Sequence, residues 1–220
     1  FESFVKIRME EGMNLKFNDI EIQNWFYSSK ISLLNFLKND YLNSSNKLNY
    51  KNLFFLIYGF NRMGYFEESK KLLEVLLKKL KFTEKKIDYK DIIDVCFLLL
   101  SFADYYKLVR DSDFLQFNYG EIKDLGRVLL KSIKKIKNID DFPTNSIPGY
   151  CIKEGHNLDI IILTSALYQL SYLARCSGIF GDEKKFNNES LRFSQKFLSL
   201  LNIDSDNSIN DFYFYNIFSG

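Results

Sequence analysis

Three long apolar segments constrain the fold of this chain more than any other feature of its sequence. Residues 50–63, 89–109 and 158–176 are apolar on nearly every side of a helix, and a more polar helical segment follows each across a turn. A helix that is apolar all round must be buried, whereas an amphipathic helix covers a core. The sequence therefore predicts helical hairpins in which buried and covering helices alternate, as in an α/α toroid or an α-solenoid.

Local signals mark where these helices begin and end. Gly64 is placed to stop the first buried helix, and Glu67 and Glu68 then lie in the first turn of its partner, where acidic groups suit the helix dipole. The covering helices of the next two hairpins are predicted at about 113–137, with an interruption at Gly120, and at about 183–201. Gly178 and Gly181 are predicted to end the helix that precedes the last of these. Together these helices are fewer than a closed toroid of six hairpins needs, so the chain is predicted to be part of a longer barrel or an open array.

A further helix is predicted at about 20–40, with Asp19 as its N-cap. Trp25 belongs to its wide apolar stripe and is therefore assigned to the core rather than to a surface. The apolar stripe consists of Ile22, Trp25, Phe26, Ile31, Leu33, Leu34 and Leu37.

The two ends of the chain differ from this helical pattern. Residues 4–9, Phe-Val-Lys-Ile-Arg-Met, alternate loosely before Glu10-Glu-Gly12, which predicts a short strand and turn. We assign residues 1–18 to a linker or the end of a β segment, 19–205 to a helical-hairpin domain, and 206–220 to an aromatic-rich tail. The tail carries five aromatic residues between positions 209 and 218, so it is expected to pack against other structure or to form an interface.

Composition narrows the classes of function. A hydrophobic content of 46% excludes disorder, and only two prolines and ten glycines disfavour a many-stranded sandwich. The net charge of +2 is spread along the chain, which argues against a nucleic-acid partner. No apolar stretch reaches the length of a membrane span and the first residues do not resemble a signal peptide, so no membrane partner and a cytoplasmic location are expected.

No metal or other cofactor is predicted from the sequence. The three cysteines, Cys96, Cys151 and Cys176, lack metal-ligand spacing and are expected to be reduced thiols. The only histidine, His156, has no second histidine or cysteine at a ligand spacing.

Several segments, in their order along the chain, carry a resemblance to a known enzyme family. The segments are Trp25–Leu34, Leu53–Ser69 with its Gly-Tyr-Phe-Glu-Glu-Ser turn, Asp88, Ala103–Asp111 with its paired tyrosines, and Ala166–Ala174 followed by Gly181-Asp182. They resemble the successive hairpins of the (α/α)6 catalytic domain of glucoamylase-type glycoside hydrolases, over roughly residues 20–205. The resemblance implies a six-hairpin toroid and an inverting hydrolase of α-linked glucose oligosaccharides.

The residues at the implied active site depart from the family pattern. Active members hold the sugar with the Arg and Asp of a Trp-x-Arg-Asp motif, which aligns here with Lys51 and Asn52. Lysine lacks the fork of arginine, and asparagine lacks the charge of aspartate. The family's general acid aligns with Ile152, and a slip of two residues gives the role to Glu154, with His156 beside it.

An inverting glycosidase also needs a second carboxylate, which in the family lies later than the last helix predicted here. The resemblance therefore implies an eroded site in which Glu154 is the one catalytic candidate. The substrate-binding candidates are Lys51, Asn52, Tyr50, Tyr150, His156 and Trp25.

Structural roles explain the same residues without any chemistry. The Glu154-Gly-His156 segment would then turn the chain into the helix at Leu158, and Tyr105 and Tyr106 would pack between hairpins. The alternative function is a non-catalytic helical-repeat scaffold for protein–protein interaction, because Gly64-Tyr-Phe-Glu-Glu-Ser-Lys-Lys-Leu-Leu73 is also similar to tetratricopeptide repeats. The hydrolase hypothesis predicts an oligosaccharide partner, whereas the scaffold hypothesis predicts a protein.

Overall fold

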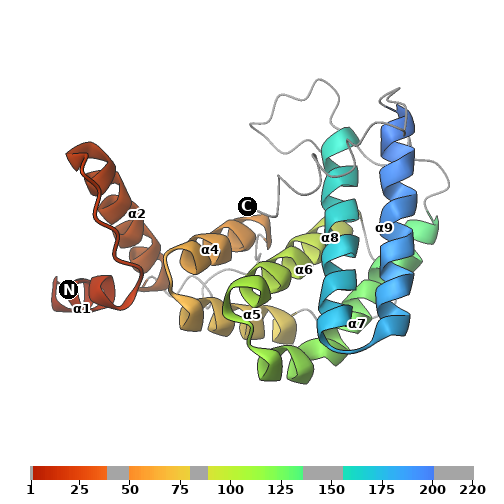
Figure 1. The fold of residues 1–220 in the computed structure, drawn as a ribbon, viewed down its shortest axis with the longest axis horizontal. Coiled ribbons are helices and arrows are strands. Elements are labelled where there is room, and N and C mark those ends of the chain that lie inside the picture. The colour runs from red at the N-terminus through yellow and green to blue at the C-terminus, as the bar shows by residue number, and fades with distance from the viewer. Residues whose placement is uncertain (1, 39–49, 80–88, 136–155, 201–220) are drawn as a thin grey trace. The chain divides into compact units, whose positions relative to one another are not determined.

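The computed structural model is all-α over the residues that it describes, which are 2–38, 50–79, 89–135 and 156–200 (Figure 1). This confirms the all-α prediction, and the predicted helix positions agree with the structure to within a few residues. The helices are α1 (Glu2–Glu11), α2 (Ile20–Lys38), α4 (Tyr50–Arg62), α5 (Phe66–Lys79), α6 (Tyr89–Val109), α7 (Ser112–Lys135), α8 (His156–Cys176) and α9 (Phe180–Leu200).

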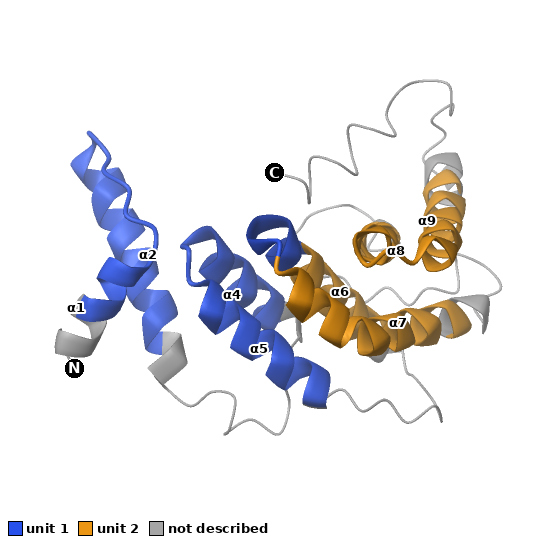
Figure 2. Cartoon of the chain, turned by 60° about the horizontal axis from the view of Figure 1, so that its bottom comes forward, with its two compact units in different colours: residues 1–80, 104–110 blue, residues 81–103, 111–220 orange. Residues whose placement is uncertain are grey.

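The chain divides into two compact units, which are coloured separately in Figure 2. Unit 1 comprises residues 1–80 and 104–110, and unit 2 comprises residues 81–103 and 111–220, so α6 contributes to both. Within unit 1, α2 contacts both α1 and α4, and α4 packs against α5. Within unit 2, α8 packs along α9 and also contacts α7.

The last hairpin pairs a buried helix with a covering helix, as the sequence predicts, whereas α4, predicted to be buried on nearly every side, exposes Phe55 and Tyr58. Residues 161–167 of α8 are all buried, whereas its partner α9 buries one face through Phe186, Ser190 and Phe193. In unit 1, α5 buries one face in the same way, through the leucines at 72, 73, 76 and 77. An amphipathic helix buried on one face closes the core that the apolar helix fills.

Two hairpin turns share one backbone geometry. Gly64, after α4, has φ 78°, and Gly178, after α8, has φ 74°. The Tyr65 amide donates to Phe60 O at 2.8 Å, and the Ile179 amide donates to Ala174 O at 2.9 Å, which are the six-to-one bonds of Schellman caps. The prediction that Gly64 ends the first buried helix is therefore confirmed.

The two turn glycines are expected to differ in their tolerance of alanine. Gly178→Ala should lower the free energy of unfolding by about 1 kcal/mol, because only the left-handed backbone opposes it and no other atom lies within 4 Å of the added Cβ. Gly64→Ala should cost about 2 kcal/mol or more, because its Cβ would also lie 3.0 Å from Met13 N. Urea unfolding of the two variants measures this difference, and equal losses would contradict the contact with Met13.

The strand predicted at residues 4–9 is wrong, because residues 2–11 form α1. A helix brings residues three apart onto one side, and Arg8 Nη1 lies 2.6 Å from Glu11 Oε2. The following segment joins α1 to the first hairpin turn, since the Met13 amide donates to Met63 O at 2.7 Å. The ion pair within α1 and the hydrogen bond of the following segment stabilise a helix here, whereas the alternation of apolar residues that predicted a strand is weak.

Two glycine assignments also need correction. The interruption predicted at Gly120 is wrong, because α7 runs unbroken from Ser112 to Lys135. Gly120 is exposed and meets no other atom, so the helix loses only the intrinsic propensity of one residue there. Gly181, predicted to help end the preceding helix, lies instead in the first turn of α9.

Candidate functional site

For most of the predicted site residues, the structure does not describe the side chain. Glu154 and Tyr150 lie outside the described residues. Tyr50 and Lys51 are the first residues of α4 and His156 is the first residue of α8, but their side chains also lie outside the described part. The predicted grouping of the catalytic acid with its neighbours therefore stays a prediction.

Two predicted binding residues are described, and both are exposed. Asn52 lies on the surface of the first turn of α4. The side chain of Trp25, on α2, is 71% exposed, so the prediction that it belongs to the core is wrong. Helix geometry explains the error: Leu34 is buried, and nine residues at 3.6 residues per turn place Trp25 on the opposite side of the helix.

A partly buried polar cluster joins the C-terminal ends of α4 and α6 within unit 1. Asn61 Nδ2 donates to Asp104 Oδ2 at 2.7 Å, and Arg62 Nη2 lies 3.0 Å from Asp104 Oδ1. The guanidinium of Arg62 also stacks on the ring of Tyr58, 4.4 Å from its centroid. We call Asn61, Arg62 and Asp104 the Asp104 cluster.

All three residues of this cluster lie in segments that carry the family resemblance, but a contact between them was not predicted from the sequence. Asn61 and Arg62 lie in the second-hairpin segment, and Asp104 lies in the third-hairpin segment, more than forty positions later. One sequence signal was present, since Asp104 is a charged residue directly after the apolar run of α6. A buried charge needs a partner, although the sequence does not say which one.

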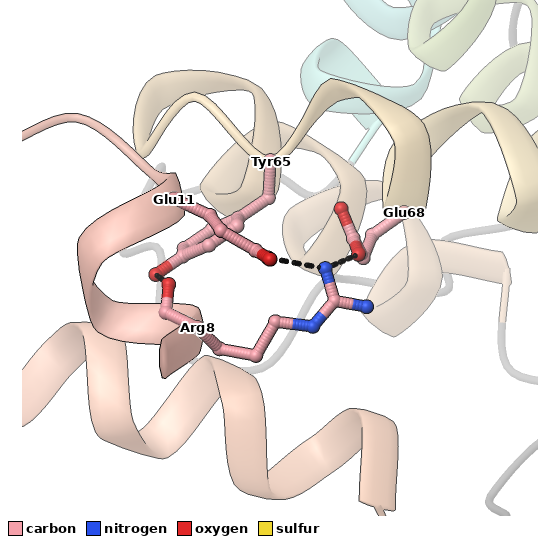
Figure 3. A network of polar contacts seen from close by, with 4 residues as sticks. All are labelled: Arg8, Glu11, Tyr65 and Glu68. Atoms are coloured by element: carbon pink, nitrogen blue, oxygen red, sulfur yellow. Dashed lines mark hydrogen bonds and ion pairs between the residues drawn. The ribbon is translucent and has the colours of Figure 1, made fainter. Parts of the chain in front are cut away.

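A second polar network holds α1 against the first hairpin, also within unit 1 (Figure 3). Arg8 Nη1 lies between two carboxylates, 2.6 Å from Glu11 and 2.8 Å from the buried Glu68. The hydroxyl of Tyr65 donates to the carbonyl of Arg8 at 2.8 Å. The network connects the last turn of α1 to the first turn of α5.

Lys30 of α2 completes the attachment of α1, although it was not singled out in the sequence. Its side chain is fully buried, and its Nζ donates to Met9 O at 2.7 Å and to Met13 O at 2.9 Å. A third contact, at 3.3 Å, reaches Asn14 Oδ1. The rings of Phe26 and Tyr65 lie 5.8 and 5.5 Å from the same nitrogen. An ammonium group has three donors, and here each has an acceptor.

The surroundings of Tyr65 raise its pKa to about 12, from an ordinary value of 10.0. Burial is the main cause, and the nearby carboxylates Glu68 and Glu11 add to it because they oppose a phenolate charge. An unfolded chain would therefore release this proton at a lower pH than the folded chain. The contribution of neutral Tyr65 to stability is complete below pH 10 and is lost as the pH rises from 10 towards 12.

Tyr65→Phe is expected to remove the loss of folding stability that ionisation of Tyr65 causes at alkaline pH. At neutral pH the variant should be less stable by about 1 kcal/mol, because it lacks the hydrogen bond to Arg8 O. Between pH 10 and 12 the wild-type chain should lose about 2 to 3 kcal/mol that the variant retains. Urea unfolding across this range measures both slopes, and parallel curves for the two proteins would refute the assignment.

Unit 2 contains a comparable link between α7 and α9. Asp182 Oδ2 lies 2.6 Å from Lys123 Nζ and accepts a hydrogen bond of 3.2 Å from the buried hydroxyl of Tyr119. Burial raises the pKa of Tyr119, and the charge of Asp182 raises it further. The buried Glu68 and the partly buried Asp104 and Asp182 each bind a cation on another helix, which fits a role in holding helices together.

Comparison with known proteins adds no family to this description. No protein-family model matches the chain, and no curated protein or solved structure matches it either. Within the described ranges, His, Cys, Asp and Glu side chains do not gather in a group of three that could hold a metal ion. None of the described helices combines the length and the apolar character needed to cross a membrane.

Proposed function

We propose that this chain is a helical-hairpin domain of the glucoamylase type that binds α-linked glucose oligosaccharides without hydrolysing them. The architecture that we propose for the domain is an α/α toroid, complete or in part. The pairing of the buried helix α8 with the covering helix α9 supports this, and so do the shared turns after α4 and α8. The Asp104 cluster adds support, because it connects the second and third hairpin segments that carry the resemblance.

Trp25 is the observation that carries the binding proposal. An exposed indole offers a flat apolar surface on which the apolar face of a sugar ring can stack. Near it on α2, Asn24, Ser28 and Ser29 are exposed, polar and uncharged, and Glu21, one turn earlier, is exposed and charged. Hydrogen-bonding groups beside an exposed aromatic ring suit a hydroxyl-rich ligand.

Trp25 also provides the test, because it is the only tryptophan in the chain. Its fluorescence should be readily quenched by acrylamide, and saturating maltoheptaose should protect it. A β-linked glucose oligosaccharide of similar length serves as the matched control and should protect it less. Equal quenching with and without maltoheptaose would overturn the role of Trp25.

Hydrolysis is expected to be negligible, because the sugar-holding Arg and Asp of the family are replaced by Lys51 and Asn52. Purified protein should release no glucose from maltose at ordinary enzyme rates, and Glu154→Gln should change nothing. A measurable rate in the wild-type chain that Glu154→Gln abolishes would instead establish Glu154 as the general acid of an active hydrolase.

A non-catalytic scaffold for protein–protein interaction is the second candidate, and the surface of α2 favours it. Besides Trp25, this helix exposes Ile20, Ile22 and Ile31, whose side chains are 70%, 45% and 38% exposed. Ile22 lies one helical turn before Trp25, so these two exposed apolar side chains are neighbours, and adjacent exposed apolar residues are typical of interaction surfaces. The fluorescence experiment separates the candidates, since a scaffold predicts that neither oligosaccharide protects Trp25.

A further inference from the structure

The outer side of α7 presents one aromatic side chain between two carboxylates. Phe117 is 88% exposed, and the exposed Asp113 and Glu121 lie about one helical turn before and after it. Neither carboxylate pairs with a cation among the described residues, and the nearby Asp124 is paired with Arg127 at 2.9 Å. We call Asp113, Phe117 and Glu121 the α7 surface.

The outer side of α9 has the inverse pattern, a cation between two apolar side chains. Phe180 and Leu191 are 68% and 51% exposed, and Lys184 is exposed between them. From Phe180, the helix completes about one full turn to Lys184 and about three to Leu191, so all three side chains lie on one side. We call Phe180, Lys184 and Leu191 the α9 surface.

Lys184 gives the α9 surface its charge. Two nearby carboxylates of α9, those of Glu183 and Glu189, lie 2.8 and 2.7 Å from guanidinium groups. These groups belong to Arg175 and Arg192. Lys184, in contrast, has no ion-pair partner in the part of the chain that the structure describes. The α9 surface is therefore positive where the α7 surface is negative.

The two surfaces point away from each other within one molecule. Asp182 of α9 contacts Tyr119 and Lys123 of α7 at 3.2 and 2.6 Å, so these residues mark the sides on which the two helices face each other. Around α7, Tyr119 and Lys123 lie about 200° and about 240° from Phe117. Around α9, Leu191 lies about 180° from Asp182. One chain therefore cannot bring its own two surfaces together, whereas two chains can.

We propose that the α7 surface of one copy of this chain docks on the α9 surface of a second copy. Phe117 is the apolar anchor, and Phe180 and Leu191 are the apolar side chains that it packs against. The carboxylates on either side of Phe117 attract Lys184, so the charges hold the two helices in register. Each surface supplies the charge that the other lacks, which is why a second copy fits better than an unrelated partner.

The two surfaces also match in length, and both belong to unit 2 (Figure 2). The α7 surface extends over about 12 Å between Asp113 and Glu121, and the α9 surface over about 16 Å between Phe180 and Leu191. Because the contact joins two different surfaces, every complex leaves one of each kind free, and chains can associate head to tail. The oligosaccharide surface on α2 belongs to unit 1 and takes no part in this contact.

Sedimentation velocity of the full chain tests the self-association. A contact of this size is weak, so the average sedimentation coefficient should rise between about 10 μM and about 1 mM protein. It should not level off at the value of a dimer, because head-to-tail association continues. About 0.5 M NaCl should reduce the rise, because salt screens exposed charges. A monomer throughout this range would overturn the proposal.

Variants connect the association to the two surfaces. Phe117→Ala should weaken it about tenfold or more because the anchor is lost, and Lys184→Glu should do the same because three carboxylates then meet. Both positions are exposed, so circular dichroism should show an unchanged fold. Phe55→Ala and Lys71→Glu are matched controls at exposed residues of unit 1 and should associate as the wild-type chain does. Wild-type association of both surface variants would place the contact elsewhere and contradict the assignment.

A mixture of the two surface variants shows which surfaces meet. Phe117→Ala keeps an intact α9 surface, and Lys184→Glu keeps an intact α7 surface. An equimolar mixture should form a one-to-one dimer that neither variant forms alone and that does not grow further. Association of either variant by itself at the wild-type strength would mean that like surfaces meet, and would contradict the head-to-tail contact.

Discussion

Replacing Gly126 with leucine is expected to lower the free energy of unfolding by about 3 kcal/mol, because it overfills the packed contact of α7 with α8 and α9. A Cβ at this position would overlap Leu170 Cδ2 and would lie 2.9 Å from Phe186 Cζ. Both neighbours are essentially fully buried, at 0% and 1% exposure, and so have little room to move away. Chemical denaturation followed by circular dichroism measures the loss.

Gly120→Leu is the matched control for this prediction, because it makes the same substitution in the same helix. The site is exposed and has no other atom within 4 Å of the added Cβ. Leucine favours a helix over glycine by about 0.8 kcal/mol, so this variant should be slightly more stable than the wild-type chain. Similar destabilisation by both substitutions would mean that α7 does not pack through Gly126.

Lys30→Met is expected to cost about 3 kcal/mol, because it removes all three hydrogen bonds that the fully buried Lys30 makes to the segment after α1. Methionine is also long and unbranched, so the change removes the charge and its hydrogen bonds with little change in packing. The carbonyls of Met9 and Met13, now 2.7 and 2.9 Å from Lys30 Nζ, would be left without this partner. The segment after α1 should then separate from the first hairpin.

Hydrogen exchange provides a local measurement of that separation. The Met13 amide, which donates to Met63 O at 2.7 Å, should exchange faster in Lys30→Met. Lys71→Met is the control, since Lys71 is exposed on α5 and its loss should change stability by less than about 0.5 kcal/mol. Equal effects of the two substitutions would show that the ammonium group of Lys30 is not a structural link.

The positions of the helices were predictable because their signals are local. Apolar periodicity located α4, α6 and α8, and Asp19 was expected as the N-cap of α2. Its Oδ1 accepts hydrogen bonds from the Glu21 and Ile22 amides at 2.8 and 3.3 Å. Such features depend on residues within one or two turns, which the sequence lists in order.

Packing between helices was not predictable from the same signals. A lysine in an amphipathic helix is normally exposed, and only the fold places three acceptors around Lys30. Trp25 was assigned to the core because the apolar stripe of α2 is wider than the face that is buried. Gly120 and Gly126 are equivalent in sequence, and only their neighbours in space separate them.

The candidate site was less predictable than the fold. The resemblance directed attention to Glu154, outside the described residues, and to His156, the first residue of α8. Among the polar groups that the structure connects are Asn61, Arg62 and Asp104. These residues were visible in the sequence only as parts of hairpin signatures. Their contact joins the ends of α4 and α6, and a pairing between separate elements has no local signal.

Isothermal titration with maltoheptaose, with released glucose assayed in the same sample, tests the central claim most directly. We expect saturable binding without glucose release. We also expect binding that is about tenfold weaker or worse in Trp25→Ala and unchanged in Phe117→Ala, a control at an aromatic residue that is 88% exposed on α7. Saturable binding with glucose release would contradict the claim that the site is inactive. No binding to the folded chain would contradict an oligosaccharide ligand and favour the scaffold.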